Sequence, residues 1–488
     1  MSRIKFFFLR NRSYILFTAL AVLSLRLFFW KLGQAALVDN DEATYAQVVK
    51  DMLSSGHLLS LTYFGGSWFD KPPLYFWIAA LCVKIFGLNE FALRLPSALT
   101  GIGTVLLVWA ISLRLTKNDW IAFGSGLVLL TTSLFVYAGR EVRLDIPVTF
   151  FIMLGFYCFI RGIENSKWNI GMGVSAALGV LTKSAIGLLM VPIVLLFSIF
   201  NRSWGWLTDK FFWIGACCSL LIALPWHLYE SMMFGSTFWN SYFFYHIVER
   251  FQQNILGGNI PFMVYFTLLY QYVEPWSTFF LALCVTLLAI LLVDKDKDKK
   301  RKVVTIVSYL SAVVLVLLVF SIAQTKLFNY LDPLFPFAAL FIAAVMGYIY
   351  ERLDNPVYKR SVIGIFALMV VIGLFQTINL SFALYIDPDD QALTQEERSV
   401  GLLIRSYPPS YVAYVYELNY FPTLDFYGGR QVKEFTNSPP AGSMLLAFPT
   451  QLMKDGGVTQ AYINSSKVLY SGTYLTLVAY SPLLKMNP

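Results

Sequence analysis

Three acidic residues stand close together in the stretch VDNDEATYAQ, directly after a hydrophobic segment: Asp39, Asp41 and Glu42. Acidic side chains in the first turn of a helix interact favourably with the positive end of the helix dipole. At a membrane surface that faces cation-rich loops, a carboxylate can instead accept a proton or hold an acceptor group. The sequence alone leaves both interpretations open.

A second group with chemical potential is SWFDKPPLYFW, in which Asp70 and Lys71 precede two prolines. The prolines can simply start a helix, with the Lys71 side chain extending to lipid headgroups. Alternatively, a rigid turn holds the Lys71 ammonium beside a phosphate. A phosphate ester needs such fixed positive charge, both for binding and for neutralising the phosphate as it leaves.

Further charged residues stand at the ends of hydrophobic segments. GREVRLDIP brings Arg140, Glu141, Arg143 and Asp145 together, and two arginines with two acids can satisfy one another. Two other motifs add basic and phenolic groups, namely Lys183 in LTKSAIG and Lys326 with Tyr330 in AQTKLFNYLDP. Either lysine alone is more typical of a segment flank than of a ligand, but five cations on one face would form an anion pocket.

The loop between residues 230 and 263 contains aromatic and amide side chains together with His246, Glu249 and Arg250. Long loops of this kind commonly cover sites. His246 and Asp70 are a possible zinc-like metal pair, although two ligands are fewer than a zinc site needs. No Walker loop, Rossmann glycine pattern, Ser-His-Asp order or CxxC pair is found. Chemistry driven by soluble nucleotides is therefore disfavoured. An enzyme that acts outside the cytoplasm cannot use cytosolic nucleotide sugars, so a lipid-linked sugar donor is the chemically sensible substrate.

The elements that position these residues are membrane helices. The chain of 488 residues is 57% hydrophobic and 14% charged, which is implausible for one soluble core. Hydrophobic segments recur over residues 1–385, each of about the 20 residues that cross a bilayer. The net charge of +8 is scattered over loops, so that retention of basic loops in the cytoplasm explains it better than nucleic-acid binding.

Hydropathy predicts eleven spans, near residues 13–31, 93–113, 120–138, 146–161, 168–182, 185–200, 211–229, 264–293, 303–323, 330–350 and 361–384. The predicted number of membrane helices is therefore about eleven to thirteen. Basic loops place the N-terminus in the cytoplasm, and an odd number places the C-terminus on the opposite side. Every motif described above then falls on the outer face. Residues 71–87 are short for a span and are interpreted as a helix lying in the membrane plane.

Residues 386–488 differ in composition from the membrane domain, residues 1–385. Thr394 and Glu397 have the spacing of a capping box at the start of a helix. Alternating segments such as YVAYVYE, MLLAFP, KVLY and YLTLVAY predict strands. The predicted fold is thus an all-α polytopic membrane domain followed by a small extracytoplasmic α/β domain.

In these motifs the sequence resembles the C-type membrane glycosyltransferases that use polyprenyl-phosphate sugars, and specifically the bacterial branch related to aminoarabinose lipid A transferase and protein O-mannosyltransferase. The similar pieces extend over about residues 36 to 340 and are DEATYA, FDKPPLYFW, FGLNEFALRLPSAL, RLD, LTKSAIGLL, PWHLY, HIVERF and TKLFNYLDPLFP. The chain differs from the family pattern in having Thr44 where arginine is frequent and Asp70 where glutamate is frequent.

The resemblance implies an enzyme of the inner membrane that moves a sugar from an undecaprenyl phosphate to a lipid A, glycolipid or protein acceptor. It implies that Asp41 is the catalytic carboxylate, with Glu42 as the alternate, and that Asp145 is a further catalytic acid of the site. It also implies that Lys71 binds the donor phosphate and that Tyr330 meets it, with Arg143, Lys183 and Lys326 as helpers. A zinc site would fall on Asp70 and His246. The alternative function is a transporter or flippase of lipid-linked sugars.

Overall fold

A computed structural model describes residues 3–38, 41–254, 260–293, 300–383, 388–416, 421–435, 444–450 and 466–480. Asp39 lies outside the described residues. Contacts within the chain divide it into two compact units. The first contains residues 1–30, 68–78 and 94–382, and the second contains residues 31–67, 79–93 and 383–488.

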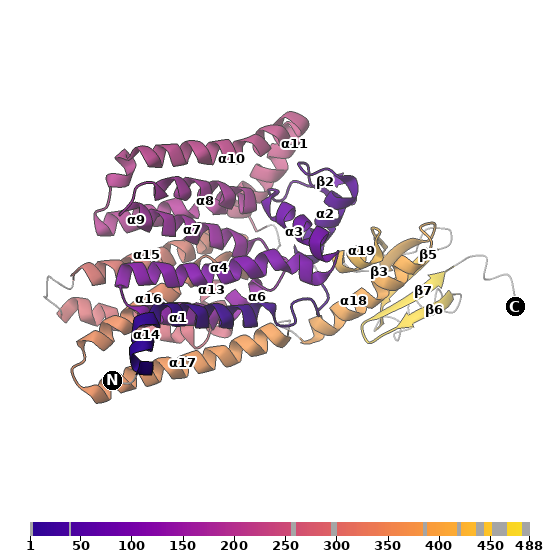
Figure 1. Cartoon of the computed structure of the whole chain (residues 1–488). Helices are drawn as coiled ribbons and strands as arrows, with labels where there is room; N and C mark the ends of the chain where they lie inside the picture. The colour runs from indigo at the N-terminus through magenta and orange to yellow at the C-terminus, as the bar shows by residue number, and fades with distance from the viewer. Residues whose placement is uncertain are drawn as a thin grey trace. The chain divides into compact units, whose positions relative to one another are not determined.

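The first unit is a helical bundle (Figure 1). Its long helices are α1 (Arg3–Phe29), α4 (Glu90–Thr116), α7 (Asp145–Gly162), α8 (Trp168–Lys183), α9 (Met190–Asn201), α10 (Lys210–Phe234), α14 (Trp276–Val293), α15 (Lys300–Ile322), α16 (Leu334–Arg352) and α17 (Pro356–Ala383). Shorter helices are α5 (Asp119–Leu130), α6 (Ser133–Ala138), α11 (Ser236–Trp239), α12 (Arg250–Gln252) and α13 (Val264–Tyr272). Brief 3₁₀ or π segments are η1 (Ser184–Leu189), η2 (Gly205–Thr208), η3 (Asn240–Glu249) and η4 (Phe328–Leu331).

Burial separates the centre of this bundle from its periphery. The apolar windows of α7 and α16 are 67% and 72% buried, whereas those of α10 and α17 are only 11% buried. The centre is therefore built around α7 and α16, while α10 and α17 present apolar side chains to the surrounding lipid. Helices α8 and α10 approach closely at Gly173 and Gly215, because neither residue has a side chain. A Cβ atom on Gly173 would lie 2.0 Å from the Gly215 carbonyl oxygen. Such contacts between small residues are typical of membrane helices.

Eight helices of the described chain are long and apolar enough to cross a membrane, or up to nine if a bent pair is one span. The eleven predicted spans exceed this number for a local reason. Residues 120–138, predicted as one span, form two short helices, α5 and α6, separated at Thr131 and Thr132. The two spans predicted within residues 168–200 fall in one apolar stretch, Trp168–Asn201.

Within that stretch the chain turns back at Ser184, whose φ of +50° lies in the left-handed region. Gly187 consequently packs against Gly179, where a Cβ atom would approach the Gly179 carbonyl carbon to 2.1 Å. The turn lies where the sequence predicted a boundary between two spans. The sequence thus predicted the break within Trp168–Asn201. Neither α8, with 16 residues, nor α9, with 12 residues, is long enough for a full span.

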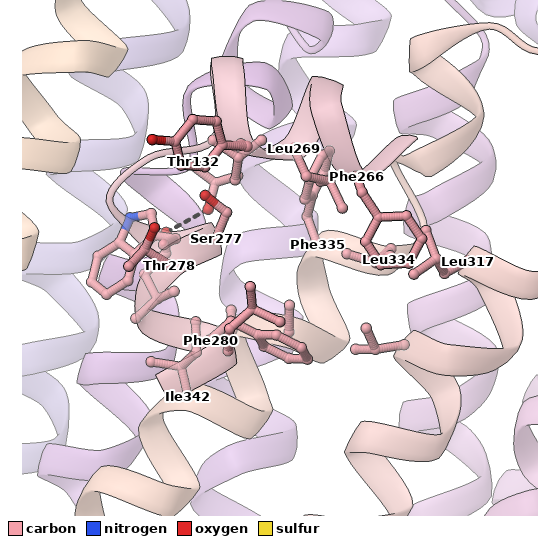
Figure 2. A pocket seen from close by; sticks show the side chains of 18 residues that line it. Thr132, Phe266, Leu269, Ser277, Thr278, Phe280, Leu317, Leu334, Phe335 and Ile342 are labelled. Carbon is pink, nitrogen blue, oxygen red and sulfur yellow. Dashed lines mark hydrogen bonds between the residues drawn. The ribbon is translucent and has the colours of Figure 1, made fainter. Parts of the chain in front are cut away.

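The bent pair consists of α13 and α14, whose axes differ by 113°. The Trp276 indole nitrogen fixes the bend to α5 by donating to the Thr131 carbonyl at 3.0 Å. Beside the bend lies a cavity of about 170 Å³, lined almost wholly by apolar side chains from α5, α13, α14, α15 and α16. Figure 2 shows Phe266, Phe280 and Phe335 around this space.

The second unit contains α2 (Asp41–Ser55) and a small mixed sheet (Figure 1). Strands β3 (Val412–Tyr416), β4 (Lys433–Phe435), β5 (Met444–Pro449), β6 (Ser466–Ser471) and β7 (Leu475–Tyr480) have the spatial order β4-β3-β5-β7-β6. β3 pairs in parallel with β4 and β5, whereas β7 is antiparallel to β5 and β6. Helices α18 (Pro388–Ser406) and α19 (Pro422–Gly428) complete it, with the hairpin of β1 (Thr62–Tyr63) and β2 (Gly66–Ser67).

The predicted fold class, a polytopic helical membrane domain with a small C-terminal α/β region, is confirmed. One local prediction is wrong. Thr394 and Glu397 do not form a capping box, because α18 already begins at Pro388 and both side chains are buried in its interior. The predicted in-plane helix corresponds to α3 (Leu74–Phe86), which has 13 residues and is too short to cross a membrane upright. The division into domains 1–385 and 386–488 stays a prediction.

Candidate active site

A buried acid cluster joins three segments that are far apart in the sequence. Asp145 is the first residue of α7 and forms an ion pair with Lys183, the last residue of α8. Its second carboxylate oxygen accepts a hydrogen bond of 2.9 Å from the Asn329 side chain in η4. Asp145, Lys183 and Asn329 are 4%, 7% and 2% exposed, respectively. The charge of Lys183 is therefore already compensated within the protein.

Asp332 completes this buried acid cluster of Asp145, Lys183, Asn329 and Asp332. Its side chain is 1% exposed, and its Oδ2 atom has no hydrogen-bond partner within the described part of the chain. Burial and the charge of Asp145 raise the pKa of Asp332 well above its ordinary value, against the opposing charges of Arg143 and Lys183. Asp332 belongs to the motif AQTKLFNYLDP, but nothing in that pattern distinguishes it from a residue at the start of a helix.

The two arginines predicted near Asp145 have different environments. Arg140 donates to the carbonyl oxygens of Leu27, Phe28 and Trp30, at 2.7, 3.1 and 2.7 Å. Burial, together with the charge of Arg94, lowers the pKa of Arg140 to about 10, so it stays charged at neutral pH. Its role is to cap the C-terminal end of α1, where a cation is favourable.

Arg143, by contrast, is paired with an acid of its own segment. Its guanidinium forms an ion pair with Glu141, and the group lies 5.0 Å from the ring centre of Phe328. The mutual pairing considered for this motif is thus found for Arg143 and Glu141, while Asp145 pairs with Lys183 instead.

A second cluster surrounds Asp70, which accepts a hydrogen bond of 2.8 Å at Oδ1 from His246 Nε2. The Lys71 ammonium lies 3.2 Å from the backbone oxygen of Asp70. Burial would raise the pKa of Asp70, but the His246 hydrogen bond and the charges of Lys71 and Arg250 outweigh it and lower this pKa. Burial also lowers the pKa of His246, with help from Lys71 and Arg250 and against Asp70. At neutral pH the pair is an aspartate and a neutral histidine.

The hydrogen bond between Asp70 and His246 bears on the predicted metal site at these two residues. The two side chains already bind each other through the atoms that a cation would take, and no group of three or more His, Cys, Asp or Glu suited to a metal occurs among the described residues. Two such ligands do not satisfy a tetrahedral zinc site. Among the described residues, Asp70 and His246 therefore do not supply enough ligands for a tetrahedral zinc site.

Arg250 and Tyr330 extend this second cluster. The Arg250 Nη1 atom lies 3.5 Å from the Tyr330 hydroxyl, and the Arg250 carbonyl accepts a hydrogen bond of 3.0 Å from the Thr325 amide. Lys183 Nζ lies 5.3 Å from the centre of the Tyr330 ring, so Tyr330 adjoins both clusters. We name Asp70, Lys71, His246, Arg250 and Tyr330 the cationic patch. Lys326, four residues before Tyr330, is buried.

Aromatic packing holds the cationic patch in place. Phe69, next to Asp70, packs edge-on against Phe234 and Phe238, and Phe238 stacks on Tyr242 with ring centres 4.9 Å apart. Burial raises the pKa of Tyr242 to about 12, so its hydroxyl is neutral. The segment with Asp70 and Lys71 is thereby fixed to the loop that carries His246 and Arg250.

The first acidic motif lies in the second unit, where its members differ in environment. Glu42 is 2% exposed, and its Oε2 atom accepts a hydrogen bond of 2.8 Å from the Val38 amide. It therefore closes the start of α2 in the manner of a capping residue. Asp41, the first residue of α2, is half-buried.

A family model described as dolichyl-phosphate-mannose-protein mannosyltransferase matches residues 70–229. An undecaprenyl phosphate-alpha-4-amino-4-deoxy-L-arabinose arabinosyl transferase of Enterobacter sp. is 30% identical over 63% of this chain and 55% of that protein. The protein of the same name from Aeromonas salmonicida is 29% identical over 77% and 68%, respectively.

Among solved structures, ArnT from Cupriavidus metallidurans bound to undecaprenyl phosphate aligns with a TM-score of 0.74. The alignment covers 98% of this chain and 99% of that chain at 16% identity. The Archaeoglobus fulgidus oligosaccharyltransferase aligns with a TM-score of 0.58 at 12% identity, covering 98% of this chain and 75% of that one. The chain is thus similar in sequence to transferases that use lipid-linked sugars and shares the fold of ArnT.

The resemblance stated from the sequence is confirmed, as is the assignment to an enzyme class that transfers sugars. The family-model match includes Asp70, Lys71, Asp145 and Lys183 but ends before Arg250. Arg250 was visible in the sequence as part of the loop that contains HIVERF, yet only the fold brings its side chain to Tyr330. The roles of individual residues stay predictions.

Proposed function

We propose that this glycosyltransferase moves a sugar from undecaprenyl phosphate to a lipid A, glycolipid or protein acceptor at the outer face of a bacterial inner membrane. The N-terminus would be cytoplasmic and the C-terminal region extracytoplasmic. The curated relatives named for undecaprenyl-phosphate aminoarabinose support the donor class. The single observation that carries the proposal is the cationic patch, where charged groups from separate segments converge.

In the proposed reaction, the patch binds the donor phosphate. Within the cationic patch, Lys71 and Arg250 each carry a positive charge and Asp70 carries a negative charge. His246 is neutral, so that the patch has a net positive charge. This surplus favours a phosphate, and the Tyr330 hydroxyl can donate to it. As the bond between the sugar and the phosphate oxygen breaks, its electron pair stays on that oxygen. Fixed cations stabilise this developing charge without reorganisation.

The acceptor end of the reaction is assigned to Asp41. An acceptor oxygen forms the new bond to the anomeric carbon of the sugar. If that oxygen belongs to a hydroxyl group, its proton passes to the Asp41 carboxylate, whereas an anionic acceptor phosphate needs no base. Glu42 is less suited to this role because its carboxylate is buried and bonded to the Val38 amide.

Asp145 is assigned a supporting role. It binds Lys183 and Asn329, and the Lys183 ammonium lies 5.3 Å from the centre of the Tyr330 ring. Arg143 is paired with Glu141. These residues would support the position of Tyr330. Lys326 is buried nearby in sequence and adds positive charge to the same segment.

The test is the transfer of labelled sugar in membranes, with a panel of undecaprenyl-phosphate sugars. The wild type, Asp41→Asn, Lys71→Ala and Arg250→Ala are compared at matched amounts, with Lys84→Ala as a control at an exposed lysine of α3. We expect transfer by the wild type and the control and a loss in the other three. The labelled product identifies the acceptor. Full transfer by Lys71→Ala and Arg250→Ala would remove the proposed phosphate site, and no transfer by the wild type would favour a transporter.

A further inference from the structure

The segment just before α2, the helix that begins with Asp41, is bound by α19 of the C-terminal region. Thr423 Oγ1 donates a hydrogen bond of 3.1 Å to the carbonyl oxygen of Leu37. The Leu37 amide donates at 3.0 Å to the hydroxyl of Tyr427. Both backbone groups of one residue are thus bound by two side chains one helical turn apart, nearly 400 residues later in the chain.

The partners of Tyr427 fix its hydroxyl group in turn. This hydroxyl donates a hydrogen bond of 2.8 Å to Glu90, whose carboxylate also lies 3.3 Å from Arg398 of α18. Thr423 and Tyr427 are 0% and 7% exposed. Burial, together with the charge of Glu90, raises the pKa of Tyr427, so the hydroxyl keeps its proton. A buried polar group with all of its partners in place is rigid and costly to disrupt.

The clamped residue is directly connected to the first turn of α2. Val38, the next residue, donates its amide to Glu42 at 2.8 Å and accepts a hydrogen bond of 3.1 Å from the Ala43 amide. Asp41 directly precedes Glu42 and Ala43 at the start of α2. A displacement of Leu37 would therefore reach the first turn of α2 through the two hydrogen bonds that its neighbour Val38 makes with Glu42 and Ala43.

Two further contacts join α19 to α2 and to β1. Lys50 Nζ donates to the Phe426 carbonyl at 3.2 Å, and the Tyr63 hydroxyl donates to Asp425 Oδ2 at 3.1 Å. The other oxygen of Asp425 accepts from the Val432 amide at 2.7 Å, next to β4. The attachment thus continues from α2 through α19 into the sheet.

We propose that Tyr427 and Thr423 are positioning residues that set the location of Asp41, so that the C-terminal α/β region supports sugar transfer without itself touching the substrates. This inference rests on the proposed role of Asp41. It gives the C-terminal region a function in the reaction that its sequence did not indicate. The two side chains act on the backbone of Leu37 and hence on the start of α2.

The first measurement is hydrogen exchange of the whole protein in nanodiscs. Tyr427→Phe removes one hydroxyl that makes two of the hydrogen bonds, and Thr423→Val removes the third with little change of shape. Tyr411→Phe is the matched control, since it removes a hydroxyl group of the same region outside this network. We expect faster exchange in a peptide spanning residues 37–46 for the first two variants only. Peptides containing Lys71 or Arg250 should be unchanged.

The second measurement separates kcat from KM in labelled-sugar transfer. Misplacing a catalytic group by about 1 Å can cost roughly a hundredfold in rate, so we expect kcat to fall at least about tenfold for Tyr427→Phe. Loss of one hydrogen bond in Thr423→Val should cost about fivefold. The KM for the donor should stay constant, because the cationic patch is intact. A variant that is merely less stable would instead lose active protein, which thermal melting and protein amount detect.

The two measurements distinguish the possible failures. If Asp41→Asn transfers sugar normally, the proposed function of Asp41 is wrong. The exchange data then still decide whether Tyr427 and Thr423 hold the backbone of Leu37 in place. If Asp41→Asn is inactive but Tyr427→Phe and Thr423→Val match the control in both exchange and kcat, the positioning role is overturned. Should Tyr427→Phe fail to fold, Thr423→Val alone decides.

Discussion

The buried acid cluster and the cationic patch contain similar side chains but differ in charge balance. In the first, Lys183 is matched by Asp145 and is almost inaccessible to solvent. In the second, Lys71 and Arg250 surround Asp70, whose side chain is 35% exposed. A matched, buried ion pair serves to hold segments together, whereas an accessible surplus of positive charge can bind an anion. The difference teaches that charge balance and exposure, rather than residue type, separate support from binding.

The largest effect is expected for Lys183→Ala. It leaves the Asp145 carboxylate buried without its cation, and breaking a buried ion pair typically costs about 3 to 5 kcal/mol. We expect strongly reduced thermal stability in detergent and little protein in the membrane. The double variant Lys183→Met with Asp145→Asn should regain much of the stability. If Lys183→Ala is as stable as the wild type yet inactive, Lys183 is a substrate ligand and the comparison fails.

Next in size is Arg250→Ala in the cationic patch. We expect sugar transfer to fall roughly a hundredfold, as for other fixed groups that stabilise developing charge, without a comparable loss of stability. Arg202→Ala, at an exposed arginine, is the control. Kinetics and thermal melting on the same preparations test this pattern, and a large drop in melting temperature would assign Arg250 to support instead.

A smaller effect concerns the pH dependence of the Asp70–His246 pair. Burial of His246 lowers its pKa below 6.5, so the unfolded chain binds a proton more readily than the folded one. Stability attributed to the neutral histidine is present above pH 6.5 and declines as the pH falls from 6.5 towards the lower pKa of the folded state. The lowered pKa of Asp70 keeps its carboxylate ionised over this range. Melting of His246→Gln between pH 7.5 and 5.5 should therefore depend less on pH than that of the wild type.

The smallest expected effect is that of a chelator. Because Asp70 and His246 bind each other and do not form a three-ligand group with other described residues, removal of divalent metal ions should change neither melting nor transfer. The check is both measurements with and without a chelator, followed by added zinc. A zinc-dependent rise in melting that His246→Gln abolishes would instead support the metal pair.

Hydropathy was sufficient to predict the helical membrane region, since a bilayer imposes long apolar segments, and alternation was sufficient for the strands β3, β5, β6 and β7. The partners of the charged side chains were harder to predict from the sequence. GREVRLDIP allowed its four charged residues to satisfy one another, but Arg140 binds carbonyls of α1 and Asp145 binds Lys183. These choices depend on which helix ends meet in space, which spacing along one chain does not determine. Thr394 and Glu397 failed for a related reason, because the true start of α18 lies six residues earlier.

The bend between α13 and α14 imposes an order on membrane assembly. Backbone groups at a broken helix find no water in the hydrocarbon region, so such a break is tolerated only where protein covers it. Here the Trp276 indole binds the Thr131 carbonyl, which was synthesised 145 residues earlier. Because α5 precedes α13 and α14 in the chain, we expect the bent pair to insert stably only once this partner is in place.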